Sequence, residues 1–268
     1  MIFKKNKTAP VPKIELFDSH CHLDFETFDN HRENLVEKAR KEGIVGILIP
    51  AVTKERWRLV RQLAARYPGI YSALGLHPMF MGEHQDRHLR DLEMALSIKP
   101  IWAVGEIGLD HYEKNADRAA QYQLFKAQVA IASNARLPLI LHVRKAHEEV
   151  LRLLRHNRFE FGGIVHAFNG SAEQAGRYRD LGFKFGFGGA ITYPRAVRLR
   201  SLVSGLPLTD IVIETDAPDM PPITCEKGKN TPLHLFDNFR SLCELREEPA
   251  HEIARQTTAN VREVLNIS

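Results

Sequence analysis

Two histidines one residue apart follow a short apolar segment near the N-terminus. His20 and His22 lie at the end of the stretch 14–20, whose apolar residues predict a β-strand. Successive side chains of a strand point to opposite faces, so the two imidazoles point the same way. Together they supply half of a metal site, although a pair in a surface loop is the commoner case. On its own, the pair leaves both interpretations open.

Residue types that bind metals recur at the ends of later apolar segments. Each of these segments has the length of a strand, and its end carries a histidine or a carboxylate. With the first pair, the candidates are His20, His22, Glu106, His142, His166 and Asp216. One such residue at a strand end is more often an ordinary hydrogen-bonded side chain. Six of them converging on one face indicate a metal centre.

Four histidines with two carboxylates are more ligands than one tetrahedral ion needs. They suffice for two ions that share a bridging carboxylate and a bridging water, with Glu106 as the expected bridge. The expected distribution is His20, His22 and Asp216 on one ion, and His142 and His166 on the other. Imidazole and carboxylate ligands do not select one metal. The predicted cofactors are therefore two divalent ions, with Zn²⁺, Mn²⁺, Mg²⁺, Ni²⁺ and Co²⁺ left open.

The segments that must position these residues alternate between strand and helix along the whole chain. The predicted strands are 14–20, 44–50, 70–76, 101–107, 139–142, 163–167, 183–187 and 211–215. The predicted helices are 31–42, 54–67, 89–98, 116–134, 146–156, 172–181, 197–204, 236–245 and 250–265. This alternation favours parallel pairing with right-handed crossovers. Eight strands favour a closed (β/α)8 TIM-type barrel, with the dinuclear site at the carboxyl ends of the strands.

Composition agrees with a barrel of this size. The chain has 268 residues, of which 44% are hydrophobic and 26% charged, so a sizeable core is available. No composition shift marks a domain boundary, and we expect one domain over 1–268, with 1–13 as a loose N-terminal extension. The net charge of +4 neither requires nor opposes a polyanionic ligand.

Cysteine usage and the N-terminal sequence bear on the compartment. The 3 cysteines form no CxxC pair, which argues against a disulfide framework and fits a reducing environment. No apolar run is long enough for a signal peptide or a membrane span. The sequence therefore predicts a cytoplasmic protein without a membrane segment, and we expect a monomer.

Several ordered motifs resemble those of the TatD family of metal-dependent deoxyribonucleases. They are DSHCHLD (18–24), GLHP (75–78), GEIGLD (105–110), HAFNG (166–170) and ETDAP (214–218). GGAITYPR (188–195) and DAPDMP (216–221) look closest to its YjjV-like branch. The resemblance implies a TIM-type barrel, a dinuclear site made by the six candidate ligands, and hydrolysis of DNA phosphodiester bonds, often from a 3′ end. Met220 and His111 depart from the aromatic residues of many members, which leaves base and strand preference open.

The expected mechanism needs few further groups. Two ions about 3.5–4 Å apart would lower the pKa of a shared water and hold the scissile phosphate. Glu106 and Asp216 are the candidate catalytic residues, and Asp216 serves either as ligand only or as ligand and base. His77 and Arg144 are the candidate substrate-binding residues, since a guanidinium binds phosphate well. For His77 a structural role is equally open.

Other polar residues have weaker assignments. Asp18 and Glu214 either orient an imidazole or are satisfied inside the barrel. Arg195, Lys227 and Lys229 either follow a nucleic-acid backbone or are solvated. The element Asn-Thr-Pro at 230–232 is expected to shape a late loop.

Two other functions remain open. The first is hydrolysis of a small phosphoester or a C–N bond on the same barrel. Amidohydrolases and phosphotriesterases, which catalyse such reactions, often carry a lysine at the bridging position, where this chain has Glu106. The second is a catalytically silent binding scaffold, which is disfavoured because such a descendant is expected to have lost at least one of the six ligands.

Overall fold

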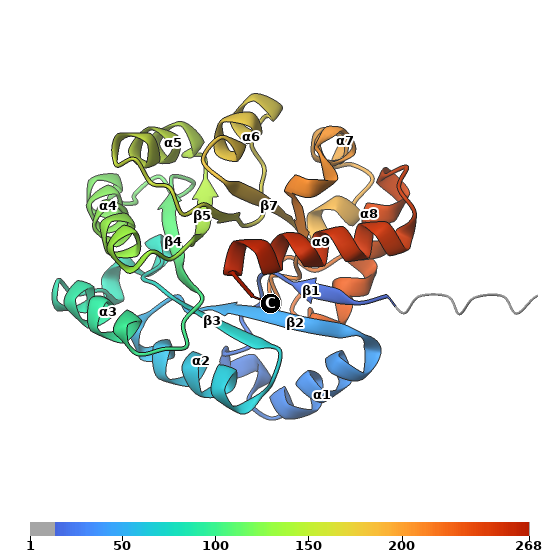
Figure 1. Cartoon of the computed structure of the whole chain (residues 1–268), viewed down its shortest axis with the longest axis horizontal. Helices are drawn as coiled ribbons and strands as arrows, with labels where there is room; N and C mark the ends of the chain where they lie inside the picture. Colours follow the sequence, from blue (N-terminus) through green and yellow to red (C-terminus); the bar gives the residue numbers. More distant parts are fainter. Residues whose placement is uncertain (1–13, 268) are drawn as a thin grey trace, which may run out of the picture.

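Eight parallel strands follow one another in chain order around a nearly closed barrel in the computed structural model, which describes residues 14–267 (Figure 1). They are β1 (Leu16–Asp18), β2 (Ile44–Pro50), β3 (Ile70–Leu74), β4 (Ala103–Asp110), β5 (Leu139–Arg144), β6 (Gly163–Val165), β7 (Phe183–Phe187) and β8 (Ile211–Ile213). Every neighbouring pair is parallel. The predicted (β/α)8 TIM-type fold is confirmed. The predicted extension, residues 1–13, lies outside the described residues.

Helices lie between the strands and cover the outside of the barrel (Figure 1). They are α1 (Arg32–Glu42), α2 (Lys54–Arg66), α3 (Arg87–Ser97), α4 (Arg118–Ala135), α5 (His147–His156), α6 (Ala172–Arg179), α7 (Val197–Gly205), α8 (Leu235–Leu245) and α9 (Ala250–Leu265). The predicted end of the first helix at Gly43 is confirmed, and this residue adopts the left-handed φ of 112° that favours glycine. A capping box between Ser171 and Gln174 starts α6.

Short 3-10 turns occupy several loops and were not predicted. They are η1 (Glu26–Phe28), η2 (Pro78–Glu83), η3 (Gly189–Thr192), η4 (Leu208–Asp210) and η5 (Pro232–His234). Turns of three to six residues carry too little periodicity to be recognised from apolar spacing.

Backbone hydrogen bonds beyond the ends of β8 and β1 close the barrel. The Ser19 N–H donates to the Ile213 carbonyl at 3.0 Å, and the Asp216 N–H donates to the His20 carbonyl at 2.9 Å. The His22 N–H donates to the Ala217 carbonyl at 2.9 Å. The segments that follow these two short strands are therefore joined directly, and they carry three of the predicted ligands.

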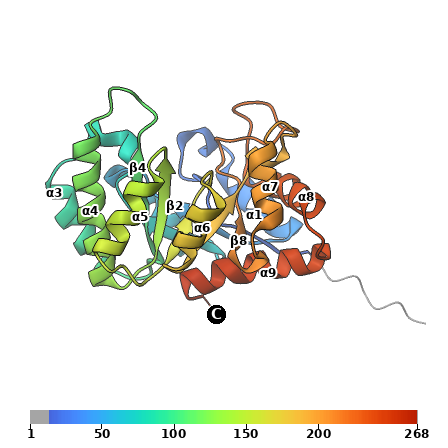
Figure 2. The ribbon, with the colours of Figure 1, turned by 90° about the horizontal axis from the view of Figure 1, so that it is seen from above.

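Inward-facing side chains fill the barrel, and α9 covers its amino end. This buried cluster consists of Phe17, Leu48, Ala73, Ala103, Ile140, Ile164, Val212, Val261 and Leu265. The last two come from α9, which Figure 2 shows lying across one end of the barrel. Thr258 of α9 donates to the Glu15 carbonyl at 3.1 Å, and Asn260 donates to the Ile211 carbonyl at 2.7 Å. Both carbonyls lie where β1 and β8 begin, which places α9 opposite the predicted site.

Two buried glutamines on one face of α4 bind backbone groups where β3 and β4 end. Gln128 accepts from the Leu76 N–H at 2.8 Å and donates to the Leu76 carbonyl at 3.0 Å. Gln121 accepts from the Asp110 N–H at 3.0 Å and donates to the Pro78 carbonyl at 3.2 Å. Buried backbone groups without a partner are costly, so these amides stabilise the loop conformations beside the site.

No helix within residues 14–267 combines the length and the apolar character needed to cross a lipid bilayer.

The contacts of α9 with the barrel interior predict a large stability loss on truncation of Leu265, which is 3% exposed. We expect Leu265→Ala to lower the free energy of unfolding by about 2–5 kcal/mol, because it leaves a cavity among packed side chains. Urea unfolding followed by circular dichroism measures this. Arg262→Ala, on the exposed side of the same helix, is the control and should change stability by less than about 0.5 kcal/mol. Equal losses in both variants would contradict this account of the helix.

Candidate metal centre

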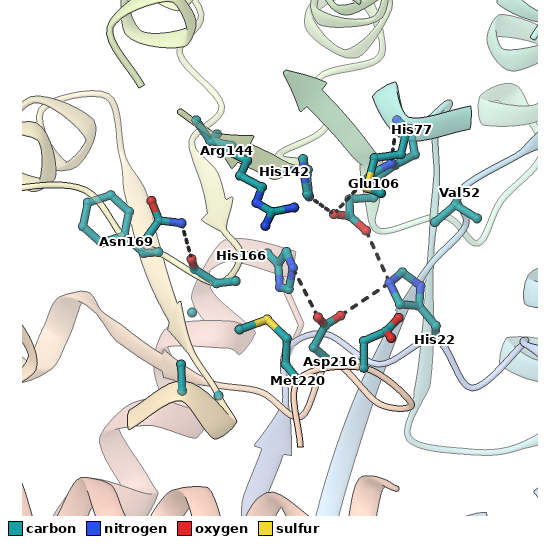
Figure 3. A pocket seen from close by; sticks show the side chains of 18 of the residues that line it. His22, Val52, His77, Glu106, His142, Arg144, His166, Asn169, Asp216 and Met220 are labelled. Atoms are coloured by element: carbon teal, nitrogen blue, oxygen red, sulfur yellow. Dashed lines mark hydrogen bonds and ion pairs between the residues drawn. The ribbon is translucent and has the colours of Figure 1, made fainter. Parts of the chain in front are cut away.

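The carboxyl ends of five strands bring all six predicted ligands together. Figure 3 shows five of them, His22, Glu106, His142, His166 and Asp216. His20 and His22 follow β1, Glu106 belongs to β4, His142 to β5, His166 follows β6 and Asp216 follows β8. Five of these residues are buried, and His142 is partly exposed. The first strand ends at Asp18, so His20 and His22 lie in the loop beyond it. Their side chains still converge, with 3.3 Å between the two Nε2 atoms.

Glu106 lies between the histidines, and its two oxygens face different partners. Its Oε2 is 3.2 Å from His20 Nε2 and 3.4 Å from His22 Nε2. Its Oε1 is 3.1 Å from His142 Nδ1 and also 3.1 Å from His77 Nε2. This carboxylate therefore contacts histidines from three strand ends at once, as the close-up shows (Figure 3).

Three sets of side chains, each with its ligand atoms within 4.8 Å of one another, could each hold a metal ion. They are His20 with His22 and Asp216, His20 with Glu106 and His166, and His77 with Glu106 and His142. The first set matches a predicted group. His142 and His166, which were expected on one ion, fall into different sets, and His77 joins one of them.

The hydrogen bonding of His20 and His22 fits a cation. Their Nε2 atoms face each other and two carboxylates, while both Nδ1 atoms are buried without a partner. Burial lowers the pKa of His20 well below its usual value and that of His22 to about 4. Both rings are therefore neutral near pH 7 and have lone pairs available. Neutral imidazoles beside a carboxylate are the ligand state that divalent metals require.

Glu106 supplies the negative charge of this arrangement. Burial alone would raise the pKa of its carboxyl group, but nearby His77 and His20 hold that pKa well below its usual value. The carboxylate thus remains ionised although the residue is only 1% exposed. The donor atoms around it fit a divalent cation by charge, by protonation state and by position.

Asp216 and His166 form the other side of the centre. The Asp216 carboxylate lies 3.5 Å from His22 Nε2 and 3.8 Å from His166 Nε2. Burial raises the pKa of Asp216 to about 8; His166 opposes the increase, and Glu106 and Glu214 add to it. The backbone of Asp216 has a left-handed φ of 52°, a conformation that asparagine and aspartate tolerate better than other side chains.

Glu214 orients His166, as one of the open predictions had it. Its Oε1 accepts from His166 Nδ1 at 3.0 Å and from the Ala167 N–H at 2.7 Å. Room for this carboxylate depends on Gly186, where a Cβ atom would lie 2.0 Å from Glu214 Oε2. Since Nδ1 donates to Glu214, the Nε2 lone pair of His166 faces the centre.

Asp18 follows the other of the two open alternatives, because its hydrogen bonds are satisfied inside the barrel. Its carboxylate accepts from the Thr215 N–H at 2.9 Å and from the Thr215 hydroxyl at 2.6 Å. It also accepts from the His20 backbone N–H at 3.3 Å, and within residues 14–267 it forms no hydrogen bond to an imidazole ring. Asp18 therefore fixes the backbone of the two ligand loops that meet at the barrel closure.

Asp110 was missed in the sequence. Its Oδ2 lies 2.9 Å from His142 Nε2, while His142 Nδ1 lies 3.1 Å from Glu106. Its Oδ1 accepts from the Tyr112 N–H at 2.9 Å. The predicted strand ended at 107, which left Asp110 in a loop, whereas β4 continues to Asp110. A strand that continued to Asp110 would have placed its side chain on the same face of the sheet as that of Glu106, because strand side chains alternate and the two residues are four positions apart.

His77 contacts the candidate ligand Glu106 directly, so its role is not limited to binding substrate. Its Nδ1 accepts from the Met79 N–H at 3.1 Å, so its Nε2 carries the hydrogen and donates to Glu106 at 3.1 Å. In this tautomer His77 supports the charge of Glu106.

A cavity of about 530 Å³ opens over the centre. Its walls are mostly apolar and include Phe25, Val52, Met79, Phe80, Phe168, Phe187, Leu199 and Met220. Arg144 is the one lysine or arginine that lines it within the described chain. The Arg144 guanidinium carbon lies 3.5 Å from the centroid of the Tyr112 ring, and in Figure 3 the side chain extends over the centre. A cation held this way above a metal centre can bind an anionic group.

The late-loop cations lie elsewhere. Arg195 packs over the ring of Tyr193, and Lys229 pairs with Glu226. Neither residue lines the cavity, and nor does Lys227. Asn230 donates to the carbonyls of Thr215 and Asp219, which confirms that it shapes the late loop.

Known proteins resemble this chain over nearly its full length. The YjjV protein of Escherichia coli, described as an uncharacterized metal-dependent hydrolase, is 40% identical over 252 residues, which cover 93% of this chain and 97% of YjjV. The YabD protein of Bacillus subtilis, with the same description, is 31% identical over 94% of this chain and 100% of its own. The crystal structure of the Escherichia coli YjjV protein superposes with a TM-score of 0.92 at 39% identity, over 96% of this chain and 100% of that one.

The family comparison agrees with these relatives. The model of the family described as "TatD related DNase" matches residues 17–266, a range that includes all six predicted ligands. The match extends from β1 to the end of α9, and the site residues occupy the strand ends at which the barrel fold places chemistry. The chain therefore belongs to the TatD family and is a metal-dependent hydrolase.

Proposed function

We propose that this hydrolase cleaves phosphodiester bonds of DNA from a 3′ end with two divalent ions. The observation that carries the proposal is Glu106, whose two carboxylate oxygens face separate histidine groups below a cavity that contains Arg144. A carboxylate in this position suits a bridge between two ions. The description of the family as a DNase supports DNA as the substrate.

The proposed ligands are His20, His22, Glu106, His142, His166 and Asp216. When bound, divalent ions at this centre supply Lewis-acid stabilisation of the phosphate and a more acidic water. Imidazole and carboxylate donors suit Zn²⁺, Mn²⁺, Ni²⁺ and Co²⁺. Asp110 and Glu214 accept from the second ring nitrogens of His142 and His166, so each ring keeps one orientation and one tautomer.

Other residues act on the substrate and on the proton. Arg144 binds a non-bridging oxygen of a phosphate next to the scissile one and neutralises its charge. Asp216, which lies beside His22 and His166, accepts the proton of the attacking water. The water oxygen then bonds to phosphorus while the bond from phosphorus to the leaving oxygen breaks, and the proton held by Asp216 passes to that leaving oxygen. Phe25, Met79 and Phe80 give an apolar wall against which a nucleobase can pack.

A small phosphoester is the second candidate substrate. The single cation and the mostly apolar walls of the cavity favour a ligand with one anionic group. A polymer with several phosphates needs cations beyond the cavity.

Glu106→Gln keeps the size of the side chain and removes its charge. We expect turnover of any phosphodiester to fall by at least about a thousandfold, because the centre loses electrostatic stabilisation of the transition state. Metal content measured by inductively coupled plasma mass spectrometry should fall as well. His156→Ala, an exposed histidine on α5, is the control and should change neither quantity. Near-normal activity in Glu106→Gln would remove the bridging role.

Asp110→Asn tests the orientation of His142 without removing a proposed ligand. We expect metal affinity to weaken about 10–100-fold, because an amide is a weaker acceptor for the ring N–H. Isothermal titration calorimetry with Mn²⁺ measures the affinity, and ¹⁵N spectra of the histidine rings report the tautomer. The control is Asp86→Asn, which alters an exposed aspartate at the start of α3. An unchanged metal affinity in both variants would show that Asp110 does not orient His142 for metal binding.

Arg144→Glu separates the two candidate substrates. If DNA is the substrate, hydrolysis of a single-stranded oligonucleotide should decline steeply with salt, since phosphate contacts release counterions. The variant should lose more activity on the oligonucleotide than on bis(p-nitrophenyl) phosphate, which has no flanking phosphates. Steady-state rates across a salt series measure both effects, with Arg58→Glu on the exposed face of α2 as the charge-matched control. A flat salt response with equal losses on both substrates would favour the small phosphoester.

A further inference from the structure

A second cavity adjoins the one above the metal centre. It has a volume of about 660 Å³ and lies between residues 169–172, which lead into α6, and helix α7. Asn169 and Leu199 line both cavities, so the two cavities share part of their walls. Figures 1 and 2 both place α7 next to α6 on the outside of the barrel. We call this second cavity the α7 groove.

The walls of the α7 groove are aliphatic and carry a single charge. Val197, Leu199 and Leu202 supply apolar surface, and the Val197 side chain is among the most exposed hydrophobic groups, at 69%. Arg198 is exposed beside them, and within residues 14–267 no carboxylate forms an ion pair with it. No acidic side chain lines the groove. The groove therefore offers one unpaired cation and an apolar surface.

These features match one nucleotide of an unpaired strand. A nucleotide brings one negative phosphate, which an unpaired arginine attracts, and one flat base, whose face can pack on the apolar side chains while its polar edge meets Asn169, Ser171 and Ser201. The base must be free of its complementary strand to enter a groove of this kind.

We propose that the α7 groove binds the nucleotide next to the scissile phosphate of single-stranded DNA, so that the strand leaves the metal centre across Asn169 and Leu199. This inference rests on the proposed phosphodiesterase function. It adds the path of the strand beyond the metal centre and the residues that bind the flanking nucleotide. Arg198 binds the phosphate of this nucleotide, and Leu202 packs against its base.

Two glycines make a matched test possible. A Cβ atom at Gly205, which lines the α7 groove, would have nothing within 4 Å, so Gly205→Trp can fill the groove without a clash at its Cβ atom. A Cβ atom at Gly82 in η2 would also have nothing within 4 Å, and Gly82 lines neither cavity. Gly82→Trp is therefore the control. Arg198→Ala removes the charge at an exposed position and leaves the helix intact.

Binding is measured by fluorescence anisotropy with the metal-loaded full chain. The probe is a labelled single-stranded hexathymidylate with phosphorothioate linkages, which resist hydrolysis. We expect the dissociation constant to rise about tenfold in Gly205→Trp and in Arg198→Ala, the size of a lost base or phosphate contact. With unmodified oligonucleotide, the ratio of its kcat/KM to that of bis(p-nitrophenyl) phosphate should fall by a similar factor. Gly82→Trp should match the wild type in both measurements.

The outcomes separate this inference from the function on which it rests. If the wild type hydrolyses the small ester but neither binds nor cleaves the oligonucleotide, the proposed function fails, and this inference fails with it. If the oligonucleotide is cleaved and both groove variants behave as the control does, only the α7 groove is excluded. The strand then leaves by another route, such as past Tyr112 and Lys145. A changed elution volume of Gly205→Trp in gel filtration, with unaltered DNA binding, would assign the groove to a second copy of the chain.

Discussion

The site depends on one buried negative charge. Glu106 lies inside the barrel mouth almost without solvent contact, and an ionised carboxylate in such a position is costly unless it is paired. His77 Nε2 donates to it at 3.1 Å, and nitrogens of His20, His22 and His142 lie within 3.4 Å of its oxygens, where they and the carboxylate can share a cation. Those nitrogens come from the ends of β1, β3 and β5, so the charge is balanced only when the strands close into a barrel. Barrel closure and site assembly are therefore one event.

Around this charge, most polar groups hold other groups in position. Glu214 and Asp110 each fix one imidazole, and Asp18 fixes the two ligand loops through Thr215. Gln121 and Gln128 hold the loops after β3 and β4 from the side of α4. Each of these groups is buried and hydrogen-bonded, which limits the movement of the residues in contact with the substrate.

Much of this architecture could be predicted from the sequence, because strand and helix periodicity is a local property. The eight strands, the barrel and the convergence of six candidate ligands followed from apolar spacing, the strand count and the position of strand ends in a barrel, and strand bounds differed by a few residues. What escaped prediction depends on distances between segments remote in the sequence. Asp110 received no role because the predicted strand ended at 107, whereas β4 continues beyond its apolar run to Asp110. The link between His77 and Glu106 joins two strands, and the α7 groove lies between two helices.

The position of α9 has a consequence for the way in which the chain folds. This helix follows β8 in the sequence, yet Val261 and Leu265 complete the packing inside the barrel. During synthesis, all eight strands therefore leave the ribosome before the side chains that cover their amino end. Until α9 docks, the interior surface around Leu48 and Ile140 stays open to water and to other chains. A nascent barrel is thus most prone to aggregation just before its last helix emerges, which is when a chaperone would protect it best.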